Sequence, residues 1–448
     1  MQLVAYGAQD VYLTGNPKVT FFQAVYKRHT NFALEVIQQT VNGTAGNNGR
    51  VSVTIARNGD LIGEMYVELK TKSDLSTRAG DSSVADSCWV AERAITDIEL
   101  SIGGQRIDKH YQLWWRLYSE LYLGADKKAN YAKLATNPTA STAGQVFLPL
   151  IFFFNRNPGL YLPLIALQYH EVRLDFDLSP YFESYLDKSS FNVWGNYVYL
   201  DTEERRRFAQ KGHEYLIDQV QHTGADSVTS SQSGSATSQV RLSYNHPIKE
   251  LVWCYSQAST ANALMWNFTS NAATSNAVVL EANAGSIQGA AFGNAYILSA
   301  ISQGTGAPQL LTGSLNASSS GAKLPSKAQW VEEGTPSATM SCGPLSSFKL
   351  ILNGQDRFKE QSGKFFNQMQ PFMHHTGTPY PGIYCYSFAL KPEEHQPTGT
   401  CNFSRIDNAQ VQVTLKPITH DNTSQWMFAV NYNVLRIQSG MGGLAFSN

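Results

Sequence analysis

The chain has 448 residues, of which 15% are charged and 12% aromatic, and its 34 basic residues nearly balance its 35 acidic ones. This balance gives no overall attraction to nucleic acid or to an anionic membrane surface, so we expect no direct contact with nucleic acid. The apolar stretches are shorter than the roughly 20 residues of a membrane span, and the first residues predict no secretory leader. The five widely spaced cysteines predict reduced, mostly buried thiols and no zinc site.

The first segment, residues 1–30, is expected to be an arm with one short helix. Asn16 and Pro17 match a helix N-cap followed by proline in the first helical position. Apolar residues then recur at helical spacing to about His29, which predicts a short amphipathic helix.

Residues 31–205 are expected to form a first β-domain. Asn58-Gly59 separates two alternating segments, 51–55 and 61–69, and this pattern predicts a β-hairpin. A second turn is predicted at Gly103-Gly104, after the strand 95–102. Leucines four residues apart predict a helix over 111–123, and further strands are expected within 146–178 and over 193–200.

A charged run, Asp201 to Gly212, indicates the domain boundary, with a solvated linker at 206–212. The second β-domain is then 213–448. Its segment 256–345 is rich in Ala, Ser, Asn and Gly, and we expect long ordered surface loops there that form a tower over this domain. The final strands are expected over 348–352, 383–390, 409–415 and 426–437.

Two short patterns occur in both halves of the chain. Phe32-x-x-Glu35-x-Ile37-Gln38-x-Thr40 returns as Tyr215-x-x-Asp218-x-Val220-Gln221-x-Thr223, displaced by 183 residues. Leu100-x-Ile102-x-Gly104-Gln105 returns as Leu350-x-Leu352-x-Gly354-Gln355, displaced by 250 residues. Echoes in the same order, with the extra residues confined to loops, favour a duplicated domain.

The number of short strands in each half, without a βαβ rhythm, predicts an all-β fold of two antiparallel sandwiches. The jelly roll is the commonest version with eight strands. Strand period and count do not separate it from an immunoglobulin-like sandwich.

The candidates for a chemical site are weak, and we expect no catalytic, cofactor-binding or metal-binding residues. Asp175 and Asp177 lie on one face of a strand, which we interpret as solvent-facing. The pair His374-His375 lacks the spacing of a metal site. Glu203-Glu204 and Glu393-Glu394 are interpreted as solvated charges, and Gly440-x-Gly442-Gly443 lacks the helix and lysine of a phosphate loop.

Longer motifs cover both halves and resemble the major capsid proteins of nucleocytoplasmic large DNA viruses, above all those of the chlorella viruses. They are GAQDVYLTGNPKVTFFQAVYKRHTNFA (7–33), ARNGDLI (56–62), IGGQRIDKHY (102–111), PLIFFFN (149–155), LPLIALQYHEV (162–172), LNGQDRF (352–358), TGTCNFSRIDN (398–408) and NYNVLRIQSGMGGLAF (431–446). The resemblance implies a double jelly-roll: two tandem, antiparallel, eight-stranded jelly rolls with short helices and long loops.

It also implies a structural protein of the virion rather than an enzyme. Three copies would form a homotrimer, the pseudo-hexameric capsomer of a large icosahedral double-stranded DNA virus, assembled in the host cytoplasm. Further partners implied are neighbouring capsomers, minor capsid proteins and, through the arm, the inner viral membrane.

Chlorella-virus capsid proteins carry covalent glycans added by viral enzymes that do not follow the standard sequon. This chain has sequons at Asn42, Asn267, Asn316, Asn402 and Asn422. We expect sugars on exposed loops of the second domain, with Asn267 and Asn316 as the first candidates and Asn402 and Asn422 after them.

Two other interpretations stay open. One is a minor capsid or spike paralogue with the same fold. The other is a carbohydrate-binding β-sandwich, suggested by Trp253, Trp266 and Tyr380, whose rings could stack on sugars if they share one face.

Overall fold

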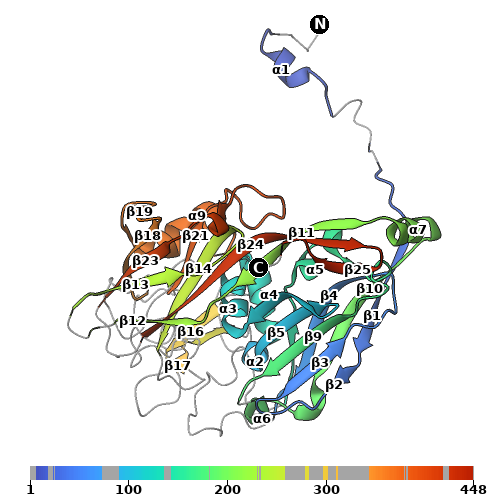
Figure 1. The fold of residues 1–448 in the computed structure, drawn as a ribbon, viewed down its shortest axis with the longest axis horizontal. Helices are drawn as coiled ribbons and strands as arrows, with labels where there is room; N and C mark the ends of the chain where they lie inside the picture. Colours follow the sequence, from blue (N-terminus) through green and yellow to red (C-terminus); the bar gives the residue numbers. More distant parts are fainter. Residues whose placement is uncertain are drawn as a thin grey trace, which may run out of the picture.

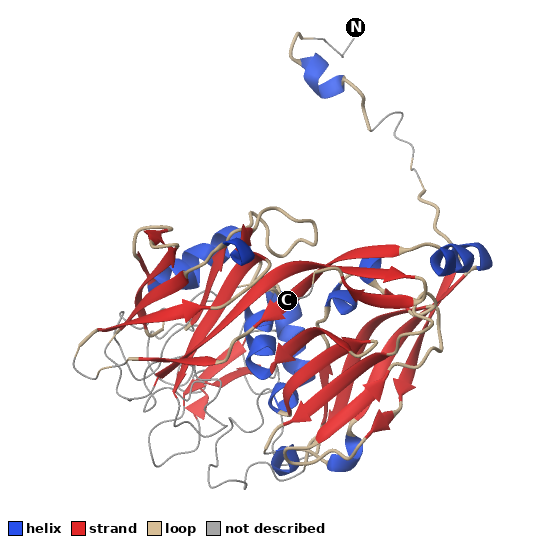
Figure 2. Ribbon diagram, in the orientation of Figure 1, coloured by secondary structure: helices blue, strands red, loops and turns tan. Residues whose placement is uncertain are grey.

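The structure is a computed structural model that describes residues 7–18, 24, 26–72, 90–135, 143–180, 182–229, 231, 234–257, 278–281, 296–300, 309–310, 343–377, 379, 382–416 and 423–446. Antiparallel strands dominate these residues and form two β-sandwiches side by side, with short helices between them (Figure 1, Figure 2). The all-β prediction is confirmed.

The first sandwich consists of two sheets that face each other. One sheet has the order β1 (Phe32–Gln39), β10 (Asn192–Leu200), β4 (Leu61–Lys70) and β7 (Gln145–Pro149), with β8 (Leu162–Pro163) beside β4. The other has the order β2 (Val41–Asn42), β3 (Arg50–Thr54), β9 (Val172–Leu178), β5 (Ile95–Ile102) and β6 (Gln105–Tyr111). Buried positions alternate along β3, as expected for a strand with one face in the core.

The second sandwich repeats this arrangement. One sheet has the order β11 (His213–Gln221), β24 (Thr423–Gln438), β14 (Pro247–Gln257) and β21 (Ile383–Ser387), extended by β12 (Ala225–Val228), β22 (Cys401–Asn402) and β25 (Met441–Leu444). The other has the order β13 (Ala236–Leu242), β23 (Ala409–Leu415), β18 (Leu345–Leu352) and β19 (Gln355–Asp356), with β20 (Gln361–Ser362) beside β18.

The two sandwiches have the same order of main strands. In each, the first strand pairs with the last long one, β1 with β10 and β11 with β24. The tight turn β5–β6 corresponds to β18–β19, and its two turn residues have positive φ in both copies: 59° and 83° at Gly103 and Gly104, 51° and 78° at Asn353 and Gly354. Both sequence echoes therefore fall on equivalent strands. The strand order is that of a jelly roll and rules out the immunoglobulin-like alternative.

The predicted hairpin at Asn58-Gly59 is wrong. β3 and β4 belong to opposite sheets, so the segment between them crosses the sandwich. Neither turn residue has the positive φ that a two-residue hairpin turn needs. The segment is fixed instead by Tyr197, whose hydroxyl donates to the Ala56 carbonyl at 2.6 Å.

The helix expected from Asn16 to His29 is also wrong for the residues described there. The arm's helix is α1 (Asp10–Thr14), which ends before Asn16, and residues 24 and 26–30 are not helical. Asn16 has φ of 51°, whereas an N-cap residue needs an extended backbone. α1 has no buried residue and stands away from both sandwiches in Figure 1.

The other helices connect strands. α2 (Val90–Arg93), α3 (Gln112–Leu121) and α4 (Ala125–Ala135) pack together, and α3 confirms the helix predicted over 111–123. The charged run forms the exposed helix α7 (Thr202–Gln210) between β10 and β11. Shorter turns are α5 (Phe153–Arg156), η3 (Pro158–Leu160), α6 (Phe182–Tyr185), η4 (Lys188–Ser190), η7 (Phe365–Met369), α9 (Gln370–His374) and η8 (Phe403–Arg405).

The expected tower of loops lies largely outside the described residues. Within 256–345, three strands form a small sheet, β15 (Val278–Glu281), β16 (Tyr296–Ala300) and β17 (Gln309–Leu310).

Candidate functional site: the junction between the sandwiches

The interior of the first sandwich and the junction side of the second form one hydrophobic cluster, and the second sandwich has a further core of its own. Ile217 of β11 and Phe428 of β24 belong to the same buried cluster as the interior of the first sandwich. Helix α3 follows β6 and carries Trp114 to Phe428, with ring centroids 5.7 Å apart. Because burying large apolar side chains is the main favourable term in packing, this contact fixes how one sandwich is oriented on the other.

At the junction, side chains form hydrogen bonds with backbone groups of the two strands that meet there. β6 and β11 are edge strands of different sandwiches, and no ladder joins them. The Val220 amide donates to Asp108 Oδ1 at 3.1 Å, and the Gln219 side-chain amide donates to the Ile107 carbonyl. Buried backbone groups need such partners, so these contacts hold β11 in one position against β6.

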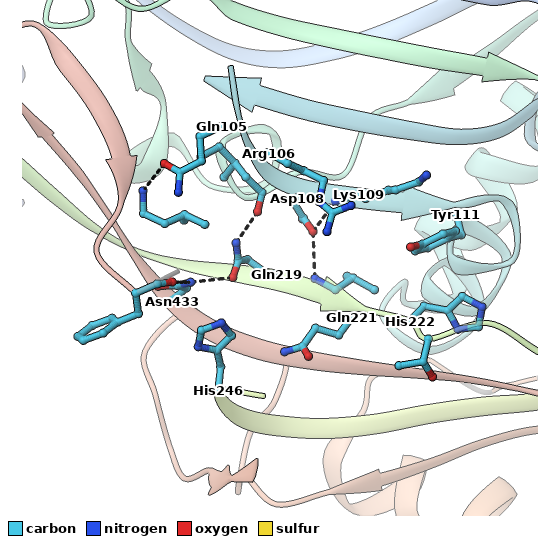
Figure 3. Close-up of a pocket in the computed structure, with 15 residues that line it drawn as sticks. Gln105, Arg106, Asp108, Lys109, Tyr111, Gln219, Gln221, His222, His246 and Asn433 are labelled. Carbon is cyan, nitrogen blue, oxygen red and sulfur yellow. Dashed lines mark hydrogen bonds between the residues drawn. The ribbon is translucent and has the colours of Figure 1, made fainter. Parts of the chain in front are cut away.

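A mainly polar cavity of about 540 Å³ opens beside these strands (Figure 3). Asp108 lines it and lies 2.9 Å from His110 Nε2, a pairing that resembles an acid–base dyad. The His110 side chain is only 2% exposed, and its ring stacks on that of Phe152, away from the cavity, with ring centroids 4.3 Å apart. The pair therefore supports the junction, where Asp108 also accepts from Val220.

A buried ion cluster crosses the junction. Asp218 on β11 accepts from Lys249 on β14 at 2.9 Å and from Arg156 on α5, in the first sandwich, at 3.4 Å. Burial lowers the pKa of Lys249, although the Asp218 carboxylate opposes this effect. Charges buried in this way are stabilised by their partners, so removing one member of the cluster leaves the others uncompensated.

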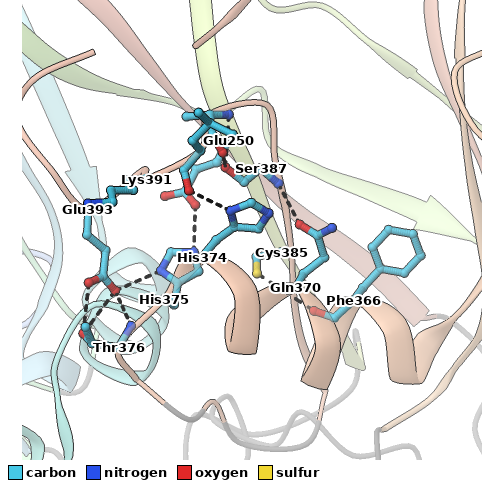
Figure 4. A network of polar contacts seen from close by, with 12 residues as sticks. Glu250, Phe366, Gln370, His374, His375, Thr376, Cys385, Ser387, Lys391 and Glu393 are labelled. Carbon is cyan, nitrogen blue, oxygen red and sulfur yellow. Dashed lines mark hydrogen bonds and ion pairs between the residues drawn. The ribbon is translucent and has the colours of Figure 1, made fainter. Parts of the chain in front are cut away.

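A second cluster surrounds His375, just after α9 (Figure 4). Its ring contacts Glu250 through Nε2 at 2.9 Å and Glu393 through Nδ1 at 3.1 Å. The ring lies edge-on to Tyr122, directly after α3, with centroids 5.1 Å apart. The cluster thus joins the second sandwich to the helical layer of the first.

His375 makes the stability of this contact depend on pH. Burial opposes protonation, but the nearby Glu250 carboxylate, with Cys385, raises the pKa of His375 well above its usual value. A raised folded-state pKa stabilises the protein fully below the unfolded value of about 6.5 and less as pH rises through the folded value. His375→Gln should therefore lower the melting temperature most at pH 6. The difference from the natural chain should shrink at alkaline pH in thermal scans, and a constant difference would contradict the protonated pair.

The structure corrects two expectations about charged residues. Asp175 and Asp177 do share one face of β9, but Asp175 is only 8% exposed because Arg173 binds it at 2.8 Å. Glu393 is not a solvated charge, since it accepts from Thr376 and contacts His375. The His374 ring forms its hydrogen bond with the Leu390 carbonyl through Nδ1 and not with the partners of His375. No group of side chains suited to a metal ion occurs in the described part of the chain.

Asp108, Asp218 and Lys249 are junction residues that the sequence patterns did not predict. One signal could have found the last of these. Lys249 and Glu250 interrupt the apolar run from Ile248 to Tyr255, and charges inside a buried strand need partners.

The predicted glycosylation sites are mostly outside the described residues. Asn267, Asn316 and Asn422 lie outside the described residues, whereas Asn402 is exposed at the end of β22. The Asn402 side-chain oxygen accepts from the Ser404 amide at 3.0 Å. Its nitrogen is the atom that would carry a sugar, so this cap leaves the attachment atom available.

The described cysteines agree with the expected thiols. Cys254 and Cys385 are buried and Cys401 is half-buried, all without a disulfide. Cys88 and Cys342 lie outside the described residues.

The aromatic residues offered as a sugar platform do not form one where they are described. Trp253 is fully buried and stacks on Phe348 at 4.4 Å inside the second sandwich. Trp266 and Tyr380 lie outside the described residues. Among the helices in the described ranges, none is long and apolar enough to span a membrane.

Two jelly rolls packed on one junction are the architecture of the family whose models match this chain. The model of the "large eukaryotic DNA virus major capsid protein" family matches residues 204–443, and that of the "major capsid protein N-terminus" matches 20–201. The chain belongs to this family of major capsid proteins.

Individual relatives match over the whole chain. The major capsid protein of Paramecium bursaria Chlorella virus 1 is 42% identical over 100% of this chain and 99% of its own, and that of Phaeocystis pouchetii virus is 40% identical over the same shares. A quasi-atomic model of the PBCV-1 virus capsid matches with a TM-score of 0.73 at 38% identity, covering 96% of this chain and 100% of its own. The Faustovirus major capsid protein shares the fold, with a TM-score of 0.66 at 13% identity over 97% and 94% of the two chains.

Proposed function

We propose that three copies of this chain form the pseudo-hexameric capsomer of a large icosahedral DNA virus shell. The observation that carries the proposal is that two sandwiches with the same order of main strands pack on each other through one buried cluster. Three such chains place six similar bodies around one axis, which lets capsomers tile a hexagonal lattice.

The test is the mass of the purified full chain in solution. Light scattering coupled to size exclusion should give three times the monomer mass at neutral pH and moderate salt. Obligate interfaces commonly bury 2,000 Å² or more, so the trimer should persist on dilution. A monomer under these conditions would contradict the proposal.

The finer assignments accompany this function. We place the arm at 1–30, the first jelly-roll domain at 31–205, the linker at 206–212 and the second at 213–448. The arm, with its exposed Tyr12 and Leu13, has no contact partner in the described body and would reach minor capsid proteins or the inner membrane. The subunit acts structurally rather than as an enzyme, with assembly in the host cytoplasm.

Covalent glycans are placed on exposed loops of the second domain. Asn402 is supported by its exposure and its free amide nitrogen. Peptide mapping of protein taken from virus particles would identify the modified residues. The relative abundance of the chain in those particles separates the principal shell protein from a minor or spike paralogue.

A further inference from the structure

We propose that the cavity at the junction between the sandwiches is a binding site for a phosphate group, either free phosphate or the phosphate of a small monoester. The site lies within one chain, so the inference goes beyond the proposed shell function and does not depend on the trimer. A ligand bound there stabilises the arrangement of the two sandwiches, because it binds the folded chain alone.

Residues of both sandwiches line the cavity. Arg106 and Lys109 come from β6 of the first sandwich, above the cavity in Figure 3, whereas His222 and His246 come from the second sandwich, below it. The volume of about 540 Å³ falls within the range of about 300–1,000 Å³ that is usual for small-molecule sites. The cavity is therefore large enough for a phosphate group together with a small substituent.

The fixed charges of the lining favour an anion. Arg106 and Lys109 are cationic, and Asp108 is the single carboxylate among the lining residues. Backbone amides and His110 hold that carboxylate, with Oδ2 2.9 Å from the ring nitrogen. Lys109 lies 3.2 Å from Asp97, which balances part of its charge. The Arg106 side chain has no hydrogen bond or ion pair in the described part of the chain, so its N–H donors are available to a ligand.

The side-chain amides of the lining are largely occupied by other groups of the protein. Gln219 accepts from Asn433 at 3.0 Å and donates to the Ile107 carbonyl. Gln221 donates to the Asn245 carbonyl at 2.7 Å and accepts from the Asn245 amide at 3.0 Å. Recognition of a ligand therefore falls mainly to the cations and the imidazoles.

One ring nitrogen at the cavity is buried without a partner. The His222 ring stacks on Phe428 and Trp426, with centroids 4.4 and 5.3 Å away. Its Nδ1 donates to the Met427 carbonyl at 2.8 Å, which leaves Nε2 as an acceptor in the neutral ring. Nε2 has no hydrogen-bond partner within the described residues. Because buried polar atoms are normally paired, this atom indicates a missing ligand or solvent partner.

A strained backbone places the second imidazole. His246 has φ of 64°, in the left-handed region that residues other than glycine rarely adopt. Its amide donates to Ser404 Oγ at 2.8 Å, and its carbonyl accepts from the Phe403 amide at 3.1 Å. Strain held in this way is common at ligand sites.

Cations beside neutral imidazoles favour hydrogen phosphate over other anions. Burial lowers the pKa of both His222 and His246, so the two rings are uncharged at neutral pH. An uncharged His222 needs a donor from the ligand at Nε2. A phosphate group, with a second pKa of about 6, keeps a proton for part of the time near neutral pH, and its other oxygens accept from Arg106. Carboxylate and sulfate are fully ionised and have no such proton.

Isothermal titration calorimetry on the purified full chain, at pH 7 and constant ionic strength, tests the site. Inorganic phosphate should bind once per chain. Sulfate, which has a similar shape but no proton to donate, should bind about tenfold more weakly or less, because the buried acceptor stays unpaired. Ribose 5-phosphate distinguishes the two sources. Tighter binding than that of inorganic phosphate assigns the site to a monoester, and weaker binding assigns it to free phosphate.

Three variants locate the bound anion. Arg106→Gln removes the unpaired cation at an exposed position and should weaken phosphate binding about tenfold or more. His222→Phe keeps a stacked ring without Nε2 and should abolish the preference for phosphate over sulfate. Arg241→Gln changes an exposed arginine of β13 outside the cavity and should bind phosphate like the natural chain.

The outcomes are independent of the shell function. Equal binding of phosphate and sulfate by the natural chain, or no heat of binding at millimolar phosphate, overturns the phosphate site. Phosphate binding that is unchanged in Arg106→Gln also overturns it, because the anion then lies elsewhere. A monomeric chain that binds phosphate contradicts the trimer and not this site. If His222→Phe does not fold by circular dichroism, the sulfate comparison and Arg106→Gln decide the question.

Discussion

Replacing Asp218 with alanine should lower the free energy of unfolding by about 3–5 kcal/mol, the usual range for breaking a buried ion pair by removing one partner. Lys249, whose side chain is 1% exposed, would lose the carboxylate that lies 2.9 Å away. Arg156, from the other sandwich, would lose the same partner. Denaturant unfolding at fixed protein concentration measures the change.

Glu214→Ala provides a control on the same strand. Glu214 pairs with Arg436 at 2.8 Å, but both side chains are more than half exposed. Exposed pairs contribute about 0–1 kcal/mol, so this variant should unfold nearly like the natural chain. Equal effects of the two substitutions would mean that Asp218 has no special part in the junction.

Replacing Phe428 with alanine should be as damaging, at about 3–5 kcal/mol, because large-to-small changes in a core leave a cavity. Phe428 is fully buried and contacts Trp114 and Tyr111 of the first sandwich. Its ring also stacks on His222 at 4.4 Å. Thermal scans should show a lower melting temperature, because the cavity lies in the buried cluster that joins the second sandwich to the first.

Phe446→Ala is the matched exposed change. Phe446 is 62% exposed near the C-terminus, so its loss should shift the melting temperature little. If Phe428→Ala behaved like Phe446→Ala, the sandwiches would be held together by something other than the buried cluster at their junction.

The sequence was most informative where local and global requirements coincide. The turn at Gly103-Gly104 was predictable because two consecutive positive φ values leave few residue choices, and the same requirement recurs at Asn353-Gly354. The duplication could also be predicted from the sequence, because equivalent strands and turns keep equivalent residue patterns. Asn58-Gly59 misled because the signal describes a turn and contains nothing about which sheet each strand joins.

The junction was much harder to predict. Asp108 and Asp218 look like ordinary strand residues, and they gain their roles only when segments 112 residues apart (Asp108 with Val220) and 31 and 62 residues apart (Asp218 with Lys249 and Arg156) come together. The residue pattern of a strand describes that strand alone, whereas the role of a buried charge depends on the groups that surround it.

Helix α7, which links the sandwiches, has no buried residue, whereas Ile217 and Phe428 bury their side chains across the junction. The orientation of the two sandwiches thus depends on the packed junction. The peptide connection between them has a different consequence. It ensures that both halves are synthesised in equal number and arrive together, so that a growing lattice never has to sort or count its two kinds of building unit.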